Sequence, residues 1–382
     1  MITEEWNVAC VGDSFNVCNQ LRLPISQSVR ERMAGPYPYY GPTSVQGWIN
    51  EYRVEGEYAL IGEDGDHFLK WRSQPMTLLV RGKFNVNNHA HLLRGTKNLT
   101  EWFYWFFANR DMTPYLTRQG AGRYKLTKAA LIQIPCALPP PPEQRAIAGA
   151  LSDVDELIGS LDQLIAKKRD LKQAAMQQLL TGQTRLPSFH GEWEVKRLGE
   201  VATIATGNTP PTRDTANYGD EFLFVSPVDL GEAKHVTTTE KRLSRKGFAI
   251  SRRFPKGSIL FVCIGSTIGK CGVALVELTS NQQINAIFPS PAFSVDYLYY
   301  FVSAAAPKIR ALAGEQAVPI VNKTQFAETA VALPSLPEQT AIAEVLSDMD
   351  AELAALEQRR DKTRALKQGM MQELLTGRTR LV

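Results

Sequence analysis

Cysteine is scarce in this chain of 382 residues, and the scarcity narrows the classes of protein to which it can belong. The cysteines form an odd count without C-x-x-C spacing, which argues against a disulfide framework and against a zinc site. No apolar run reaches the length of a membrane span, and the first residues lack the pattern of a signal peptide. We therefore predict a cytoplasmic protein with five reduced thiols: Cys10, Cys18, Cys136, Cys263 and Cys271.

Motifs of covalent catalysis are also missing. Residues 208–211 (NTPP) resemble the N-P-P-[YF] site of amino-methyltransferases, but the inserted threonine breaks the motif and no glycine-rich S-adenosylmethionine loop accompanies it. Residues 265–271 (GSTIGKC) are one residue short of a P-loop and place cysteine where Mg²⁺ needs a hydroxyl. His89 and His91 would point to opposite faces of a strand, so they make a poor metal pair. We expect no catalytic site, metal or cofactor in this chain.

Basic residues are in small excess, with a net charge of +4. The excess lies outside the repeated stretches described below, and it permits nucleic-acid binding without requiring it. One segment, residues 241–256, holds seven basic residues and no acid. This segment is either a solvated loop or a surface that follows DNA phosphates. Its cations are Lys241, Arg242, Arg245, Lys246, Arg252, Arg253 and Lys256.

The chain contains one long internal repeat. Residues 139–186 begin PPPPEQRAIAGALSDVDELIG, residues 334–381 begin PSLPEQTAIAEVLSDMDAELA, and both end on Leu-Leu-Thr-Gly-x-Thr-Arg-Leu. The two copies align without gaps at an offset of 195 residues, and more than half of the positions are identical. Chance does not produce such a match, so the fold must contain the same element twice.

Each copy of the repeat has the pattern of one long helix. Its apolar residues step by four and three, which is the spacing of a coiled-coil seam. Pro142 and Pro337 stand where helices tolerate proline, and Gly182 and Gly377 stand where glycine ends helices. We predict two rods of about 40 residues, each roughly 60 Å long, packed as an antiparallel pair. The seam consists of Ile147, Leu151, Val154, Ile158, Leu161 and Ile165, and of Ile342, Leu346, Met349, Leu353 and Leu356.

Polar positions outside the seam also recur in both copies. A coiled-coil spacer without a partner is the simpler interpretation, but a spacer needs only its seam. We infer instead that the rods display the same partner-binding surface twice, in imitation of two-fold symmetry. The candidates are Gln144, Asp153, Asp155, Lys167, Arg169 and Lys172, and in the second copy Gln339, Asp348, Asp350, Lys362, Arg364 and Lys367.

The remaining sequence forms two blocks that mix strand and helix patterns. We predict an α+β fold, in which two mixed α/β domains are separated by two long helices packed as an antiparallel coiled coil. The predicted domains are residues 1–138 and 187–333, and the predicted rods are residues 139–186 and 334–382.

Both blocks begin with the same short motif, W-x-V-x-x-x-G, at Trp6 and Trp193. The middle parts of the blocks do not align. Each block contains an aromatic segment that predicts a helix, at residues 98–110 and at residues 295–312. Glycine- and proline-rich runs between short apolar stretches predict strands and loops elsewhere. The order block, rod, block, rod is cyclic in character.

At this point the pattern resembles the specificity subunit of type I restriction–modification systems. The resemblance covers essentially the whole chain, and its main carriers are the two Pro-Glu-Gln helix starts, the two Leu-Leu-Thr-Gly ends and the two W-x-V-x-x-x-G openings. Shorter motifs resemble known recognition domains: 39–41 (YYG), 61–65 (IGEDG) and 86–90 (VNNHA) in the first block, and 207–210 (GNTP), 265–269 (GSTIG) and 281–283 (NQQ) in the second.

The resemblance implies that each block is a target-recognition domain that reads one half of a bipartite site in double-stranded DNA. The rods would space the halves by about one duplex turn, roughly 10 bp, and would dock two modification subunits. Those partners would carry S-adenosylmethionine and methylate adenine, while restriction subunits acting as motors would use ATP and Mg²⁺. The chain itself would be non-catalytic. As a departure from the family, only five residues precede Trp6, which leaves open how the first block is tied to the rods.

Polar residues in loops are the candidates for reading bases, and cations are the candidates for holding phosphates. Lys270 joins the basic segment 241–256 as a predicted phosphate contact. The alternative is that the glycine-flanked candidates only form turns and that His89 is a buried, hydrogen-bonded histidine. The predicted base-reading residues are Tyr40, Thr43, Arg81, Asn87 and His89 in the first block, and Thr209, Ser266, Asn281 and Gln282 in the second.

Two other classes of protein compete with this interpretation. A coiled-coil adaptor that binds proteins and not DNA would show no sequence-specific DNA binding, even with a methylating partner. A self-sufficient methyltransferase or nuclease is disfavoured because its cofactor and acid-cluster motifs are missing, and S-adenosylmethionine binding by the isolated chain would revive it.

Overall fold

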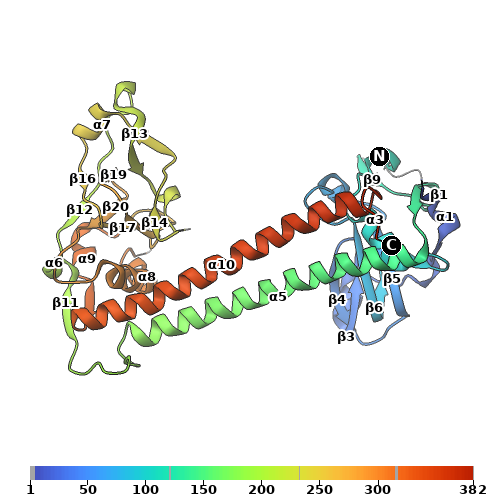
Figure 1. Ribbon diagram of the computed structural model, residues 1–382, viewed down its shortest axis with the longest axis horizontal. Helices are drawn as coiled ribbons and strands as arrows, with labels where there is room; N and C mark the ends of the chain where they lie inside the picture. Colours follow the sequence, from blue (N-terminus) through green and yellow to red (C-terminus); the bar gives the residue numbers. More distant parts are fainter. Residues whose placement is uncertain (1–4, 120–121, 232, 315–316, 382) are drawn as a thin grey trace. The chain divides into compact units, whose positions relative to one another are not determined.

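The computed structural model describes residues 5–119, 122–231, 233–314 and 317–381 (Figure 1). The chain divides into two compact units. Unit 1 comprises Met1–Asp162 and Gln358–Val382, and unit 2 comprises Gln163–Glu357. Each unit therefore contains one of the two blocks together with a part of both rods. Within the described ranges, no helix is long and apolar enough to cross a membrane.

The two copies of the repeat form the long helices α5, Pro141–Leu179, and α10, Leu336–Leu374. Both have 39 residues, which confirms the predicted rods. Gly182 and Gly377 follow the helix ends with a φ of +71°, a left-handed conformation that glycine adopts without a steric penalty. The glycine at each repeat end is therefore required by the backbone.

In unit 1 the two helices are joined by ion pairs that fix their direction. Asp155 of α5 pairs with Lys367 of α10, and Asp162 pairs with Arg364 at 2.9 Å. The later residue of α5 pairs with the earlier residue of α10, so the helices run antiparallel, as predicted. Ile147 of the predicted seam is fully buried and belongs to the same apolar cluster as Leu374 of α10, so apolar packing accompanies the ion pairs.

The same arrangement recurs in unit 2. Lys172 of α5 pairs with Asp350 of α10, and Arg169 pairs with Glu357. These are the counterparts, at an offset of 195, of the pairs in unit 1. Burial of Leu346 at the seam again accompanies them. The repeat therefore produces the same cross-helix contacts twice within one chain.

Unit 1 is organised around a six-stranded sheet in the order β2-β7-β5-β6-β3-β4. All of its neighbours pair antiparallel except β3 and β6, which are parallel. A separate pair, β1 with β10, joins the first strand of the block to the last. The strands are β1 (Asn7–Cys10), β2 (Phe15–Val17), β3 (Ala34–Tyr40), β4 (Val45–Ile49), β5 (Val54–Gly62), β6 (Thr77–Val86), β7 (Ala90–Gly95), β8 (Thr117–Gln119), β9 (Arg123–Lys125) and β10 (Pro135–Leu138).

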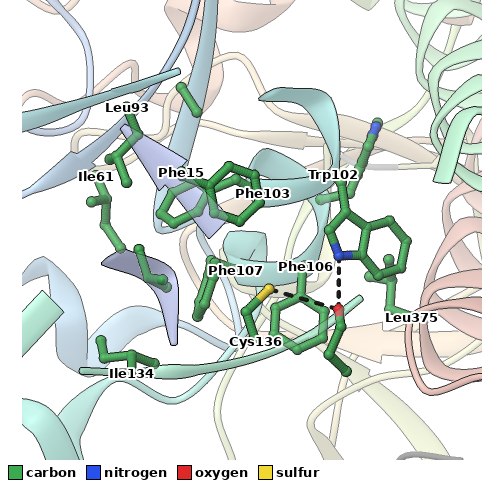
Figure 2. Packing of buried hydrophobic residues seen from close by; sticks show 14 of the residues in the cluster. Phe15, Ile61, Leu93, Trp102, Phe103, Phe106, Phe107, Ile134, Cys136 and Leu375 are labelled. Atoms are coloured by element: carbon green, nitrogen blue, oxygen red, sulfur yellow. Dashed lines mark hydrogen bonds between the residues drawn. The ribbon is translucent and has the colours of Figure 1, made fainter. Parts of the chain in front are cut away.

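The predicted aromatic helix is α3, Thr100–Ala108, and it forms the core of unit 1. Its ring-bearing residues pack on the sheet, where Phe103 meets Phe15 edge to face at 5.3 Å (Figure 2). Trp102 donates from Nε1 to the carbonyl of Ala137 at 2.9 Å. Leu375, the residue that follows α10, belongs to the same cluster. The short helices of this unit are α1 (Val11–Ser14), α2 (Gln27–Arg32) and α4 (Lys128–Ile132).

Unit 2 contains two sheets, in the orders β12-β20-β17-β18-β14 and β15-β13-β19-β16. Strand β11 pairs with β21, as β1 pairs with β10 in unit 1. The strands are β11 (Glu194–Arg197), β12 (Ile204–Thr206), β13 (Tyr218–Val225), β14 (His235–Val236), β15 (Lys241–Leu243), β16 (Arg253–Phe254), β17 (Ile259–Val262), β18 (Cys271–Ala274), β19 (Leu278–Ser280), β20 (Ile284–Ile287) and β21 (Ala330–Leu333).

The predicted helix near residue 300 is α8, Val295–Ala311. It holds the position of α3, since Tyr297 donates from its hydroxyl to the carbonyl of Ala332 at 2.7 Å, just as Trp102 donates to Ala137. The other helices of unit 2 are α6 (Leu198–Val201), α7 (Arg245–Ala249) and α9 (Lys323–Ala327). The basic segment 241–256 is thus β15, α7 and β16, not an unstructured loop.

Candidate nucleic-acid interface

The loops that follow β5 and β6 in unit 1 are held together by backbone hydrogen bonds. Glu63 N donates to His89 O at 2.7 Å, and Glu63 O accepts from Leu126 N at 2.7 Å. Gly65 N donates to Tyr124 O at 3.0 Å. Three segments far apart in the sequence are therefore fixed side by side without the use of side chains. We call this arrangement the loop frame of unit 1.

Unit 2 builds the same loop frame from unrelated residues. Cys263 N donates to Gln283 O at 2.8 Å, and Cys263 O accepts from Val321 N at 2.8 Å. Gly265 N donates to Pro319 O at 2.9 Å. Each bond has a counterpart in unit 1. The middle parts of the two blocks do not align as sequences, yet the structure shows that they share this scaffold.

One side chain does recur in the two frames. Asn87 accepts from His89 N through Oδ1 at 2.8 Å, and Asn281 accepts from Gln283 N through Oδ1 at 3.0 Å. An asparagine that bonds the backbone two residues later closes a tight turn. These two predicted base contacts therefore shape their loops, and both are at least half-buried.

The residue between the two ends of each turn is exposed. In unit 2 this residue is Gln282, whose Oε1 accepts from the hydroxyl of Thr209 at 2.7 Å. In unit 1 it is Asn88, whose carbonyl accepts from Arg22 at 3.1 Å while Arg22 pairs with Glu63 at 2.6 Å. The structure thus brings together two predicted residues of unit 2. It also adds Asn88 and Arg22, which the sequence analysis missed because the equivalence of the two turns is visible only in the backbone.

Arg252 lies beside this part of unit 2. Its guanidinium donates to the carbonyl of Thr206 at 2.5 Å, and its backbone N donates to Asn208 Oδ1 at 2.6 Å. Arg253 lies over the ring of Phe248 at 5.0 Å. Both arginines remain exposed. They are therefore held in place with donors left over, which is the state in which arginine binds phosphate at a small entropic cost.

Two cations of the basic segment have a carboxylate within 4.0 Å. Lys246 lies 2.6 Å from Asp214 and, through this hydrogen bond, lowers the pKa of that carboxyl. Arg245 lies 4.0 Å from Glu221. Five cations have no ion-pair partner within the described ranges: Lys241, Arg242, Arg252, Arg253 and Lys256.

The glycine turn between β17 and β18 holds two more predicted contacts. Gly265 and Gly269 have φ values of +95° and +104°, so only glycine fits the turn without strain. Ser266 is exposed at its tip, and its carbonyl accepts from Arg310 at 3.2 Å. Lys270 is half-buried at its end. Because Gly265 belongs to the loop frame, Ser266 lies next to it.

The predicted residues of unit 1 fall into two groups. In the first group, Thr43 and His89 are exposed, and His89 Nδ1 lies 2.8 Å from Asp64. The alternative of a buried His89 is therefore wrong. Tyr40 is half-buried against Phe84 with ring centroids 5.9 Å apart, and burial raises the pKa of its hydroxyl. The phenol stays protonated and can donate a hydrogen bond.

The second group is engaged inside the unit. Arg81 pairs with Glu57 at 2.8 Å and with Glu101. Asn87 is only 5% exposed and donates to Gln46 at 3.0 Å. The side chain of Arg81 is 60% exposed but already pairs with two carboxylates, and Asn87 is covered, so neither residue is free of partners within the unit.

The pairing of Arg81 has a counterpart in unit 2. Glu101 lies in the first turn of α3, and Asp296 holds the same position in α8. Lys234 lies 2.8 Å from Asp296 and donates to Ser347 of α10 at 3.2 Å. In both units a cation from outside the helices therefore pairs with an acidic residue in the first turn of the central helix, which is α3 in unit 1 and α8 in unit 2. No motif in the sequence marks Lys234, since it lies outside the basic segment.

Two predicted partner-binding residues prove to be interior. Gln144 is fully buried, and its Oε1 accepts from Leu99 N at 3.0 Å. Gln339 is 1% exposed, and its Oε1 accepts from Ser294 N at 2.9 Å. The expectation that these residues lie outside the seam on the surface is wrong. They recur because each ties a rod to the loop before the central helix of its unit.

The other repeated polar residues divide by their contacts. Six take part in the cross-helix ion pairs described above: Asp155, Arg169, Lys172, Asp350, Arg364 and Lys367. Four are exposed and have no ion pair in the part of the chain that the structure describes: Asp153, Lys167, Asp348 and Lys362. Contacts within the chain therefore explain why eight of the repeated polar residues recur. They do not explain why the other four recur.

Comparison with known proteins agrees with this architecture. The family model described as "Type I restriction modification DNA specificity domain" matches residues 3–167 and 190–364. The type I restriction enzyme MjaVIII specificity subunit of Methanocaldococcus jannaschii is 23% identical over 406 aligned residues, covering 100% of this chain and 94% of the relative.

Two solved structures share the fold. The type I restriction–modification S subunit from M. genitalium has a TM-score of 0.67 at 14% identity, covering 98% of this chain and 97% of that one. A structure solved to show complex assembly and conformational transition of the type I R-M system has a TM-score of 0.58 at 17% identity, covering 98% of both chains.

Proposed function

Because the chain belongs to the type I restriction–modification DNA specificity family, we propose that its two variable domains each read one half of a bipartite site in double-stranded DNA. The family assignment makes the chain a specificity subunit and not the catalytic one. We take residues 1–138 and 187–333 as the two recognition domains, and residues 139–186 and 334–382 as the rods between them.

The observation that carries this proposal is the pair of loop frames. The same backbone bonds hold Glu63 in unit 1 and Cys263 in unit 2, while the exposed residues around them differ. A fixed scaffold with variable side chains suits the reading of two different half-sites, because base choice depends on which donors and acceptors face the groove. A protein-binding adaptor would have no need of two such frames.

In unit 2 we assign base contacts to Thr209 and Gln282, with Ser266 beside them. The exposed amide of Gln282 offers both a donor and an acceptor, which is the combination that reads adenine. Asn281 supports the turn. Phosphate contacts are assigned to Lys270 and to the unpaired cations of the basic segment: Lys241, Arg242, Arg252, Arg253 and Lys256.

In unit 1 we assign base contacts to Thr43 and His89, with the hydroxyl of Tyr40 nearby. Asn88 joins them as the counterpart of Gln282. Arg81 and Asn87 are assigned supporting roles, since their side chains already have partners within the unit. The two sets differ in every exposed residue, so the half-sites should differ in sequence.

The rods are proposed to act as a ruler and to dock two modification subunits. The spacing would place the half-sites about one duplex turn apart, roughly 10 bp. Four exposed repeated residues form the proposed docking surfaces: Asp153 with Lys362 in unit 1, and Asp348 with Lys167 in unit 2. The repeated residues that pair across the rods are proposed to hold these surfaces in shape.

The proposed complex supplies what the chain lacks. S-adenosylmethionine would bind to the modification subunits and methylate adenine, and ATP and Mg²⁺ would serve the restriction subunits. The solved relative that concerns complex assembly supports a multi-subunit assembly. We place this assembly in the cytoplasm, where cellular and incoming DNA are both accessible.

The test is methylation-sensitive sequencing of DNA from cells that express this chain with a cognate modification subunit. We expect modified adenines in a single two-part motif with a fixed gap. Replacing residues 187–333 by the corresponding block of a relative should change only one half of that motif. If no motif appears although the partner is active, or if both halves change after the exchange, the proposal is wrong.

A further inference from the structure

Unit 1 carries a basic hairpin, β8–β9, next to its loop frame. Arg118 faces Tyr124 across the hairpin, and Gln119 faces Arg123. Residues opposite each other share a face of an antiparallel pair, and neighbours along a strand alternate between faces. Arg118 and Arg123 therefore lie on opposite faces of the hairpin. Both are exposed.

The hairpin itself holds Arg118 in place. Its Nη2 donates to the hydroxyl of Tyr124 at 2.8 Å, and its guanidinium lies over the tyrosine ring at 4.9 Å. An arginine fixed by stacking loses little further freedom on binding an anion, and its remaining N–H groups are free to donate. The geometry is thus that of a prepared donor and not of a mobile surface side chain.

The charge of this segment is not balanced. Residues 117–128 contain four cations, Arg118, Arg123, Lys125 and Lys128, and no acid. Lys125 lies 3.4 Å from Glu63. Arg118 and Arg123 have no carboxylate partner in the part of the chain that the structure describes. An anion from outside would therefore be the natural partner of both faces of the hairpin.

The hairpin is anchored to the residues assigned to DNA. Tyr124 O accepts from Gly65 N of the loop frame at 3.0 Å, and Lys125 forms a β-bridge with Asp64. Asp64 in turn binds His89 at 2.8 Å. The arginines are thus carried by strands that start from the proposed base-reading edge, and they add positive charge beside it.

Among the residues of unit 2 that the structure describes, no basic hairpin stands at the equivalent place. Pro319 O accepts from Gly265 N in the same way as Tyr124 O accepts from Gly65 N. The counterpart of Arg123 is Val318, which is 55% exposed. An exposed valine there offers no charge. Within the described residues, the basic hairpin is therefore a feature of unit 1.

We propose that hairpin β8–β9 is a DNA-binding arm of the first recognition domain. A two-stranded ribbon fits a groove of duplex DNA. Arg118 and Arg123 lie on opposite faces of the hairpin. In the groove, each would therefore bind phosphodiester oxygens of one of the two DNA strands that border it. This inference rests on the proposed function and adds to it a phosphate site in the first half, where the sequence shows no dense basic run.

The experiment compares the full-length chain, assembled with a modification subunit, with its Arg118→Gln/Arg123→Gln variant. The probe is a mixed-sequence DNA duplex several turns long, and the measurement is the dependence of log K on log salt concentration. Loss of two phosphate contacts should reduce the slope by about 2. The matched control is Arg32→Gln/Arg72→Gln, which removes the same charge from two other exposed arginines of unit 1 and should leave the slope nearly unchanged.

A third variant separates charge from folding. Arg118→Lys/Arg123→Lys keeps both charges and should keep the slope. If the slope is also reduced in this variant, a change in the structure of the hairpin and not the loss of charge explains the reduction, and the proposal fails. If the glutamine variant retains the wild-type slope, the proposal also fails while the proposed function stands. If the wild-type complex itself shows no salt-dependent DNA binding, the proposed function is wrong.

Discussion

Arg380 donates two hydrogen bonds to the carboxylate of Glu143, at 2.5 and 2.7 Å. Arg185 makes the same two bonds to Glu338, at 2.5 and 2.7 Å. Each arginine stands in the tail that follows one rod, and each glutamate stands in the first turn of the other rod. The C-terminal tail therefore closes unit 1 in the way that the connection after α5 closes unit 2. This answers how the first block is tied to the rods.

The two tryptophans that open the blocks complete this closure. The guanidinium of Arg380 lies over the ring of Trp6 at 5.9 Å, and that of Arg185 lies over Trp193 at 5.6 Å. Trp6 is 4% exposed. The tryptophan of each W-x-V-x-x-x-G opening therefore supplies an aromatic surface for the tail of a rod. A cation–π contact of this kind stabilises the same arginine that forms the ion pair with the glutamate.

Removal of Arg185 should destabilise unit 2. Arg185→Met leaves Glu338, which is 1% exposed, as a buried carboxylate without its partner, and we expect a loss of about 3 kcal/mol. In calorimetry this corresponds to a fall of roughly 6–12 °C in the transition of that unit.

The double variant Arg185→Met/Glu338→Met is the control, because it removes the charge along with its partner. It should unfold at a higher temperature than the single variant. Equal midpoints for Arg185→Met and the wild-type chain would show that the ion pair between the tail and the rod does not stabilise the unit.

The rods are the part of the fold that the sequence predicts best. The sequence predicts a long helix in each copy from three features: a repeat without gaps, an apolar step of four and three, and a terminal glycine. The structure has α5 and α10 at these places. The roles of Gln144 and Gln339 could not be predicted in the same way. A repeated polar residue looks the same in a sequence whether it binds a partner or a buried loop of its own chain.

The loop frames show why the site could be predicted only in part. Glu63-Asp64-Gly65 and Cys263-Ile264-Gly265 share only a glycine, because backbone groups make the bonds that hold them. Side-chain patterns cannot reveal such an equivalence. Residues with a sequence cue, such as Thr209 in its proline turn, were found, and Asn88, which has none, was not.

Acid should destabilise unit 1 through His91. This side chain is fully buried between Asn19, 2.9 Å from Nδ1, and the carbonyl of Leu126, 2.7 Å from Nε2. Burial lowers the pKa of His91 below the ordinary 6.5, although the hydrogen bond to Leu126 and the charge of Glu63 oppose the shift. Below about pH 6.5, His91 therefore binds a proton more readily in the unfolded chain than in the folded chain.

The sign follows from that difference. The contribution of neutral His91 is fully present above pH 6.5 and is lost as the pH falls below it, at up to about 1.4 kcal/mol per pH unit. Unit 2 has Asn285 at the equivalent place, bonded to Thr206 at 2.6 Å. His91→Asn should therefore flatten the decline of stability between about pH 7 and pH 5, measured by urea unfolding. An equally steep decline in the variant would assign it to other groups.

Charge reversal on the proposed docking surfaces should weaken assembly with the modification subunit. Lys167→Glu/Lys362→Glu changes one exposed, unpaired cation in each unit, and like charges at an interface cost several kcal/mol. We expect an affinity at least roughly tenfold lower in sedimentation analysis of the mixed subunits.

The matched control reverses two exposed cations of the rods that do not recur in the repeat, Arg145→Glu/Arg359→Glu. It should assemble like the wild-type chain. If both double variants lose binding equally, the repeated surface has no special role, and if neither does, the partner binds elsewhere.

Gln282 and Asn88 allow a paired test of how the half-sites are read. They occupy equivalent places in the two loop frames and are both exposed. Gln282→Ala should relax the sequence requirement in one half of the methylated motif, and Asn88→Ala in the other half. Loss of a good base contact is worth about 1–3 kcal/mol, so the preference at the affected position should fall roughly tenfold or more.

Each variant serves as the control for the other, because the other half of the motif must keep its sequence. Neither change touches the frame, since the bond from Arg22 ends on the carbonyl of Asn88 and the turn of Gln282 is closed by Asn281. Sequencing of methylated DNA after each substitution would show both halves at once. If one substitution relaxed both halves, or if neither changed the motif, bases would have to be read away from the frames, and the shared scaffold would be a feature of folding alone.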